Sequence, residues 1–438
     1  PASLPDARSV GIDFGTTNTV VALAGAQGPA HLVRFPAPER EVFAFRSALS
    51  FYAPPDLPNE RQIEAGPWAI EAYVEDPLET RFIQSFKSFA AQASFTETQI
   101  LGRRYVFEDL LSAFLLKMRE HVAGGTGDWP TRLIVGRPVT FAGGSPDETL
   151  ALTRYEAAFR RLGFTEILYA YEPVGAAFFF ARELTQDATV LVGDFGGGTS
   201  DFSIIRFTRE GGEIRSTPLA RSGVGVAGDA FDYRIIDQLV SPSLGKGSTY
   251  SSFGKTLPIP NRYYSAFARW DQLALMRASR DMREIRKLVR EADEPEKIER
   301  LVETLDENYG YLLYRSISRL KESLSSQTSA EFRFEAGSIS LARQVERTEF
   351  EGWIAPELAL IETAVDQALD QAGLPPDGID RVFLTGGSSL VPAVRDIFRR
   401  RFPAERIESG SELESIASGL ALMGRERDLG RWTMRSTV

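Results

Sequence analysis

The stretch Leu191-Val-Gly-Asp-Phe-Gly-Gly-Gly-Thr-Ser-Asp-Phe-Ser-Ile-Ile205 decides the fold of this chain. An apolar run typical of a buried strand ends at Asp194, three glycines turn the chain, and a second apolar run leaves after Asp201. Glycines lack β-carbons, so Gly196–Gly198 can present backbone N–H groups to an anion, and the Thr199 hydroxyl adds a donor. Because the carboxylates would repel a bare phosphate, the pattern predicts a divalent cation between them and it. A Gly-rich hairpin with two solvated acids is the alternative for this stretch alone.

The same arrangement occurs near the N-terminus, in Val10-Gly-Ile-Asp-Phe-Gly-Thr-Thr-Asn-Thr-Val-Val-Ala-Leu23. This segment again runs from a strand through Asp-Phe-Gly and a small polar turn to a second strand. Asp13 and Asp194 are separated by roughly the length of one domain. Two such turns predict a duplicated domain whose halves face each other across a cleft, each with a phosphate loop and a carboxylate. A chance hairpin does not explain both copies.

Composition limits the chemistry that the chain can perform. Its 438 residues, 43% of them hydrophobic, suffice for two or more subdomains, and no apolar run is long enough for a membrane helix. There are no cysteines, and neither His31 nor His121 lies beside a motif, which argues against thiolate, disulfide and histidine chemistry. The net charge of −10 argues against a nucleic-acid partner. No basic, apolar leader opens the sequence, so we expect a soluble cytoplasmic protein.

Two strand-to-helix junctions carry further candidate residues. Glu172 precedes Pro173 at the start of a predicted helix and follows a predicted strand, a common position for functional groups. A charge that favours a helix N-terminus is the alternative explanation for Glu172. The predicted strand Arg381–Thr385 runs into Gly386-Gly-Ser-Ser389, a turn with space for a ribose or base beside glycine backbone. Gly228 opens another helix whose N-terminus can hold a phosphate or ribose.

The second half of the chain reads as mostly helical. We expect a polar loop over Ser241–Pro260, long helices over Asp271–Ala292 and Pro295–Leu324, a helix over Arg347–Ala372, and a polar tail after Met423. The charged faces of the two long helices predict a solvent-exposed helical hairpin on top of a subdomain.

In sequence order these pieces resemble the nucleotide-binding domain of the DnaK-type heat-shock chaperones, in the actin and sugar-kinase superfamily, and most closely its truncated YegD-like members. The resemblance spans Gly11 to about Gly424. Five ordered motifs carry it: Asp13-Phe-Gly-Thr-Thr-Asn18, Lys87 within Phe-Lys-Ser-Phe, Glu172-Pro-Val-Gly-Ala-Ala177, Asp194-Phe-Gly-Gly-Gly-Thr-Ser-Asp201 and Leu384-Thr-Gly-Gly-Ser-Ser389.

The resemblance implies an α/β, two-lobed actin-like ATPase fold built from duplicated ribonuclease-H-like domains with inserted subdomains. Lobe I would span residues 1–185, and lobe II residues 186–424 with a helical insert at about 229–342. Residues 425–438 would form a C-terminal tail, and we expect no peptide-binding domain.

The resemblance also assigns roles to residues around ATP or ADP and Mg²⁺. Lys87 would touch the γ-phosphate, Glu172 and Asp201 would order the attacking water, and Asp13 and Asp194 would hold the waters around the metal. Asp194 and Thr199 complete the implied catalytic set. The implied nucleotide-binding residues are Gly15, Thr16, Thr17, Asn18, Gly196, Gly197, Gly198, Thr199, Gly228, Lys321, Ser325, Gly386, Gly387 and Ser388.

The chain departs from the family pattern where adenine is held. Members carry Glu-x-x-Lys-Arg-x-x-Ser there, whereas this chain keeps Lys321 and Ser325 but has Ser318 and Glu322 at the other two positions. Leu390 stands where the family has a second arginine. Each lost guanidinium removes stacking worth about 0.5–2 kcal/mol. We therefore expect phosphate binding to be more secure than adenine specificity.

Three hypotheses follow for function. The leading one is an ATP-binding, slowly hydrolysing, chaperone-like switch without a peptide-binding domain, which presents a surface to an unknown protein partner such as a nucleotide-exchange factor. The second is a small-molecule, sugar-type kinase of the same superfamily, and the third is a non-hydrolysing nucleotide-binding scaffold. Turnover without an acceptor, turnover that depends on an added acceptor, and binding without turnover distinguish the three. None of the hypotheses involves nucleic acid or a membrane.

Overall fold

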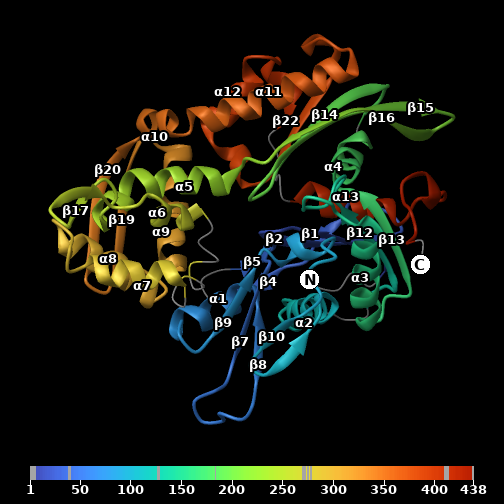
Figure 1. The fold of residues 1–438 in the computed structure, drawn as a ribbon. Helices are drawn as coiled ribbons and strands as arrows, with labels where there is room; N and C mark the ends of the chain where they lie inside the picture. The colour runs from blue at the N-terminus through green and yellow to red at the C-terminus, as the bar shows by residue number, and fades with distance from the viewer. Residues whose placement is uncertain are drawn as a thin grey trace.

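The chain folds into two lobes, each built on one large sheet, with a pair of helices between the sheets (Figure 1). The computed structural model describes residues 6–37, 41–125, 129–182, 184–268, 273, 276, 279–408 and 414–436. Lobe I here means the part built around the sheet that carries Asp13, and lobe II the part built around the sheet that carries Asp194. The described N-terminal residues enter the sheet of lobe I, and the C-terminal segment returns to the edge of the same sheet.

The sheet of lobe I contains β1 (Ala7–Phe14), β2 (Asn18–Gly25), β3 (His31–Leu32), β6 (Phe45–Arg46), β12 (Arg132–Arg137) and β13 (Glu166–Tyr171). Its strand order is β13-β12-β1-β2-β3, and β6 also pairs with β2. β1 and β2 form an antiparallel hairpin, whereas β12 runs parallel to β1 and β13 parallel to β12. Val10, Ile12 and Phe14 of β1 are buried because both faces of the sheet are covered.

The sheet of lobe II contains β14 (Ala188–Phe195), β15 (Ser200–Glu210), β16 (Glu213–Val224), β21 (Arg381–Thr385) and β22 (Ile407–Glu408). Its order is β16-β15-β14-β21-β22, with antiparallel pairs on the β15 side and parallel pairs on the β21 side. This order repeats that of lobe I strand for strand. The predicted duplication and the two-lobed actin-like fold are therefore confirmed.

Strand register fixes the neighbours of the acidic residues. On β14, Asp194 lies opposite Asp201 of β15 on one side and Thr385 of β21 on the other. Asp13 holds the equivalent place on β1, opposite Val20 of β2. Hydrogen-bonded sheet, rather than a free loop, thus brings Asp194, Asp201 and Thr385 together.

Two helices form the layer between the sheets: α4 (Glu172–Ala181) and α13 (Glu414–Met423). Their backbones touch, because a β-carbon on Gly419 would fall on the carbonyl oxygen of Gly175. α13 also packs on the sheet of lobe I, where a β-carbon on Gly11 would collide with the backbone of Ala417 and Ala421. One hydrophobic cluster joins both helices to both sheets, so the lobes share a core here.

Lobe I carries several additions beside its sheet. β7 (Ala48–Tyr52), β8 (Gln62–Ala65) and β9 (Arg81–Gln84) form a small sheet covered by α1 (Gly66–Glu75). A 3-10 helix, Phe86–Phe89, follows β9 and carries Lys87. The other elements are the short strands β4 (Phe35–Pro36) and β5 (Glu41–Val42), the hairpin β10 (Thr98–Ile100) and β11 (Arg103–Tyr105), and the helices α2 (Phe107–Glu120) and α3 (Glu148–Arg161).

The insert of lobe II begins with α5 (Gly228–Leu239), which is followed by a 3-10 helix and a hairpin. The hairpin consists of β17 (Thr249–Ser252) and β18 (Lys255–Pro258). The predicted polar loop over Ser241–Pro260 is therefore wrong, because alternation in a short polar hairpin leaves no apolar signal. The rest of the insert is α6 (Arg262–Ser265), α7 (Arg280–Leu288), α8 (Pro295–Asp306), α9 (Gly310–Ser326), β19 (Ser329–Ala336) and β20 (Ile339–Glu346).

Three predicted long helices differ in the structure. The helix expected over Asp271–Ala292 is represented by α7, and residues 271, 272, 274, 275, 277 and 278 lie outside the described residues. The helix expected over Pro295–Leu324 is two helices, because Asn308 takes a left-handed φ of 53° and ends the first. The helix expected over Arg347–Ala372 divides into α10 (Arg347–Trp353) and α11 (Ala355–Ala372), since Pro356 favours a new helix start.

The end of the described chain is packed rather than polar and free. After α12 (Pro392–Arg399) and α13, Trp432 is buried, with its ring centroid 4.8 Å from that of Phe178 and 6.4 Å from that of Phe207. Met434 forms a β-bridge with Tyr169. Among the described residues no helix is long and apolar enough to cross a membrane.

Candidate functional site

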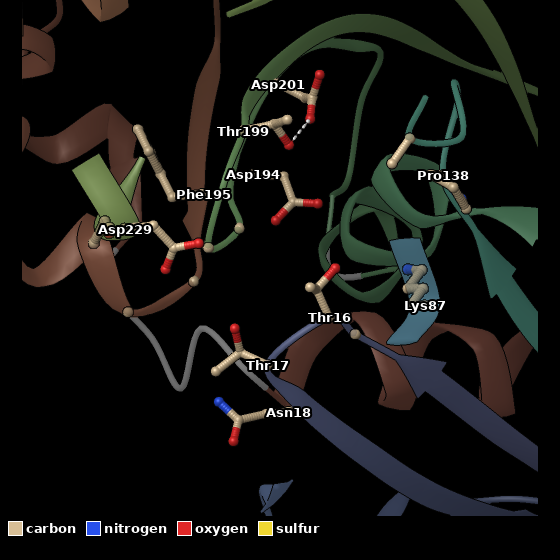
Figure 2. Close-up of a pocket in the computed structure, with 18 of the residues that line it drawn as sticks. Thr16, Thr17, Asn18, Lys87, Pro138, Asp194, Phe195, Thr199, Asp201 and Asp229 are labelled. Carbon is tan, nitrogen blue, oxygen red and sulfur yellow. Dashed lines mark hydrogen bonds between the residues drawn. The ribbon is translucent and has the colours of Figure 1, made fainter. Parts of the chain in front are cut away.

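Matching turns end the first strand of each hairpin and face one cavity. In lobe I the N–H of Gly15 donates to the carbonyl oxygen of Asn18 at 2.9 Å, and in lobe II the N–H of Gly196 donates to that of Thr199 at 2.9 Å. The cavity between them has a volume of about 610 Å³. Figure 2 shows the side chains of both turns converging from opposite walls. The duplication seen in the sheets therefore extends to the loops.

The lobe I turn is held from behind by a neighbouring strand. The Ser47 hydroxyl donates to the Gly15 carbonyl oxygen at 2.7 Å, and the Ser47 N–H donates to the Thr17 carbonyl oxygen at 2.8 Å. Ser47 and Thr19 also share a hydrogen bond of 2.9 Å between their hydroxyls. These contacts fix the backbone of the turn, so Thr16 and Thr17 line the cavity from a preformed loop.

Lys87 and Glu172 form a buried ion pair at the cavity wall. Lys87 Nζ lies 2.6 Å from Glu172 Oε1, and the side chains are 11% and 10% exposed. Burial alone would lower the pKa of Lys87, but the Glu172 carboxylate, together with Tyr155 and Asp13, outweighs it and raises the pKa above its ordinary value. Lys87 therefore stays charged, and its position at the cavity suits contact with an anion.

The other carboxylates of the site repel one another. Burial, with added repulsion from Glu172 and Asp201, raises the pKa of Asp194 to about 7, although the Thr385 hydroxyl donates to it at 3.0 Å. Burial and Glu172 likewise raise the pKa of Asp13. For Asp201, burial raises the pKa while a hydrogen bond of 3.0 Å from Thr199 opposes that shift. A bound cation would relieve this repulsion.

The donor set fits a cation held through water rather than by a full protein cage. No group of three or more His, Asp or Glu side chains in the described ranges is arranged to bind a metal directly. Mg²⁺ usually keeps several waters and takes one or two carboxylates together with phosphate oxygens. Asp13 and Asp194, one on each lobe, are the carboxylates placed for that arrangement.

The far end of the cavity is built from the start of α5, from α9 and from the turn after β21. Lys321 Nζ lies 2.5 Å from Asp232 Oδ1. A β-carbon on Gly228 would lie 2.9 Å from the Ser388 hydroxyl, so these segments pack closely. Gly386 has φ +92°, and its β-carbon would fall on the carbonyl oxygen of Phe195. Only glycine therefore fits at position 386, where the turn after β21 (the third turn, Gly386 to Ser389) contacts Phe195 at the start of the lobe II turn (the second turn, Gly196 to Thr199).

Seventeen of the predicted site residues line this one cavity: Asp13, Gly15, Thr16, Thr17, Asn18, Lys87, Glu172, Asp194, Gly196, Gly197, Thr199, Asp201, Gly228, Lys321, Gly386, Gly387 and Ser388. Gly198 and Ser325 are not among the lining residues, and the Ser325 hydroxyl donates instead to the Lys321 carbonyl oxygen at 2.8 Å. Glu322 and Leu390 stand where the resemblance expects arginines, and neither carries a guanidinium. Both side chains are exposed, Leu390 to 52%.

Several lining residues were missed by sequence reasoning. Thr385 lies within the motif Leu384–Ser389 and Asp232 lies one helical turn after Gly228, so a strand-end threonine and a helix-face acid were signals that could have been used. Arg46 and Tyr314 carry no motif, because they meet across 268 residues of sequence. Pro138 and residues 140–143 also line the cavity.

Comparisons with known proteins agree with the geometry. The Hsp70 protein family model matches residues 281–425. The chaperone protein DnaK of Thermus thermophilus is 26% identical over 439 residues, which cover 97% of this chain and 62% of the relative. DnaK of Deinococcus proteolyticus is 25% identical over 429 residues, which cover 95% of this chain and 59% of the relative.

The chain thus spans about three-fifths of the length of the curated relatives that it matches. The match to DnaK covers nearly all of the chain, and the family model covers part of lobe II together with α13. On these grounds the chain is similar to the Hsp70-type proteins over nearly its whole length.

Proposed function

We propose that the chain binds ATP or ADP with Mg²⁺ in this cavity and slowly hydrolyses ATP to ADP and phosphate, acting as a chaperone-like switch. The observation that carries the proposal is the pair of matching turns, Gly15 to Asn18 and Gly196 to Thr199, on opposite walls of one acidic cavity. Glycine N–H groups and threonine hydroxyls suit phosphate oxygens. The relatives are named chaperones, which supports a switch function for this chain.

The residues would divide the work by position. Thr16, Thr17, Gly196, Gly197 and Thr199 would cradle the phosphates from both walls. Asp13 and Asp194 would hold Mg²⁺ through its waters. When bound, Mg²⁺ supplies neutralisation of the charge on the phosphate oxygens.

The chemical step needs positioning more than covalent catalysis. Glu172 and Asp201 would orient a water whose oxygen attacks the γ-phosphorus, while the bond to the β–γ bridging oxygen breaks and ADP leaves. Lys87 Nζ, held by Glu172, would bind a γ-phosphate oxygen and offset its charge. Since this arrangement contains no activated nucleophile, a low rate is expected.

Two observations keep the other hypotheses in view. The lining of the cavity includes Ser88 and Thr140 as well as the predicted residues, and hydroxyls such as these could bind a phosphoryl acceptor, which favours the small-molecule kinase as second candidate. The exposed Leu390 where the resemblance expects a base-stacking arginine favours a weak or non-hydrolysing nucleotide site. A nucleotide-exchange factor that binds the insert of lobe II is the partner that we propose for the switch.

Calorimetric titration and phosphate-release assays test the proposal. ATP, ADP and GTP are titrated in Mg²⁺ buffer into wild type, Lys87→Ala and the exposed control Lys255→Ala. We expect ATP and ADP to bind, and phosphate release to fall about 100-fold or more in Lys87→Ala but not in the control. Turnover that requires an added sugar or alcohol would favour the kinase instead. Unchanged phosphate release in Lys87→Ala would show that the assigned chemistry is wrong.

A further inference from the structure

Arg46 extends into the cavity from the strand that supports the lobe I turn. It lies on β6 directly opposite Asn18 of β2, and the next residue, Ser47, holds the backbone of Gly15 and Thr17. The pairing of Arg46 with Asn18 and the hydrogen bonds of Ser47 therefore hold this backbone against the turn, so the Arg46 side chain extends from an ordered segment. Arg46 lines the cavity on the same wall as Thr17 and Asn18.

The side chain of Arg46 crosses from lobe I to the insert of lobe II. Its Nη2 donates to the Tyr314 hydroxyl at 2.9 Å, and its Cζ lies 5.2 Å from the centroid of the Tyr314 ring. Tyr314 is on α9, two turns before Lys321, and also lines the cavity. This contact places a guanidinium between the turn of lobe I and the Lys321–Asp232 end of the cavity.

The three cations that line the cavity differ in what they contact. Lys87 is paired with Glu172, and Lys321 with Asp232. The hydrogen bond of Arg46 goes to the Tyr314 hydroxyl; burial opposes the charged guanidinium, but Tyr314, Tyr311 and the Asp229 carboxylate, which also lines the cavity, together raise the pKa of Arg46. A guanidinium carries five N–H donors, so the bond to Tyr314 leaves donors for a planar or tetrahedral anion.

We propose that Arg46 binds the α- and β-phosphates of the nucleotide and that Tyr314 positions it for this contact. The inference rests on the proposed function, because it assigns a residue to the same nucleotide site. Arg46 lies opposite Asn18 of the lobe I turn, so its guanidinium lies beside the proposed phosphate cradle. A nucleoside diphosphate is the smallest nucleotide that carries both of these phosphates, so it is the smallest nucleotide that can make the whole contact with Arg46.

Calorimetric titration with MgADP and with adenosine separates a phosphate contact from a general effect on the lobes. For Arg46→Gln we expect ADP affinity to fall about 10–100-fold, the loss typical of a charge-assisted hydrogen bond, and adenosine affinity to change less than threefold. Arg46→Lys keeps the charge without the fork and should lose about 3–10-fold for ADP. Tyr314→Phe should lose less than Arg46→Gln. Arg34→Gln, an exposed arginine of lobe I paired with Glu41, is the matched control.

The outcomes distinguish this inference from the function on which it rests. Wild type that binds no ADP overturns both. Wild type that binds ADP, with Arg46→Gln equally tight, overturns the role of Arg46 and leaves the proposed function standing. Equal losses for ADP and adenosine show that Arg46 only holds the lobes together, which also overturns the phosphate contact. Melting curves of each variant identify misfolding, and Arg46→Lys then replaces Arg46→Gln as the deciding variant.

Discussion

Lys87 Nζ and Glu172 Oε1 are joined at 2.6 Å, although one residue comes from the 3-10 helix after β9 and the other from the first residue of α4. A buried pair of this kind adds little net stability, but loss of one partner leaves an uncompensated charge. A substitution of either residue therefore also changes the environment of the other, so the two residues have to be tested together.

Lys87→Met should lower the free energy of unfolding by about 3–5 kcal/mol, because the Glu172 carboxylate stays buried without its partner. The double variant Lys87→Met/Glu172→Gln should recover most of that loss, while phosphate release stays abolished in both. Urea unfolding without nucleotide measures the first effect. If the single and double variants have the same free energy of unfolding, the unpaired Glu172 carboxylate is not the cause of the destabilisation.

Asp194→Asn should stabilise the chain in buffer without Mg²⁺ and nucleotide. The folded chain keeps the Asp194 proton up to a pKa of about 7, whereas the ordinary value is 3.8, so the folded state binds more protons between these pH values. The free energy of unfolding of wild type then falls as the pH rises through this window. Asparagine removes this cost and still accepts the bond from Thr385.

We expect the stability gap between Asp194→Asn and wild type to widen by about 2–3 kcal/mol from pH 5 to pH 8, at about 1.4 kcal/mol for each pH unit below the pKa of about 7. Asp56→Asn in an exposed loop should show no such trend. Denaturant curves at the two pH values provide the measurement, and a constant or narrowing gap would contradict the repulsion assigned to the site. MgADP binding should be lost in Asp194→Asn.

Adjacent glycines of the third turn should respond differently to alanine. Gly386→Ala requires a left-handed residue whose β-carbon meets the carbonyl oxygen of Phe195, whereas a β-carbon on Gly387 meets nothing within 4 Å. We expect Gly386→Ala to lower the free energy of unfolding by more than about 2 kcal/mol and Gly387→Ala to change it by less than about 1 kcal/mol. Thermal unfolding of both proteins decides the point, and equal behaviour would show that the contact between β21 and the second turn is not tight.

Tyr155→Phe should be neutral or stabilising. The Tyr155 ring is fully buried, with centroids 5.9 Å from Phe14 and 6.2 Å from Phe107, and its hydroxyl has no hydrogen-bond partner among the described residues. Loss of an unsatisfied hydroxyl is expected to raise the free energy of unfolding by up to about 1 kcal/mol, with phosphate release unchanged. Destabilisation of Tyr155→Phe in urea would show instead that buried water satisfies the hydroxyl.

The parts of the fold that sequence predicted correctly have local signals. Both hairpins of the duplicated sheets combine apolar runs with a turn of small residues, and each acidic residue sits at a fixed place in that pattern. The helix breaks at Asn308 and before Pro356 depend on one residue each within long periodic segments, so periodicity alone extended the helices through them.

The site shows the same division. Asp13, Lys87 and Asp194 belong to motifs, whereas Arg46 reaches the site through a contact with Tyr314, which is distant in sequence. No local pattern predicts a pairing of this range, because it depends on how the insert of lobe II is placed over lobe I. Tertiary packing also shapes the Lys321–Asp232 end of the cavity, where the sequence departs from the pattern of the family that it resembles.

The glycine contact between α4 and α13 has a mechanical consequence. With backbone against backbone at Gly175 and Gly419, the two helices have no side-chain cushion that would let one slide along the other. We therefore expect this contact to resist sliding of α4 along α13, so that any relative motion of the lobes is a rotation about it. Such a rotation would displace most the parts farthest from the contact, among them the outer ends of the insert and of the β7–β8 hairpin (Figure 1).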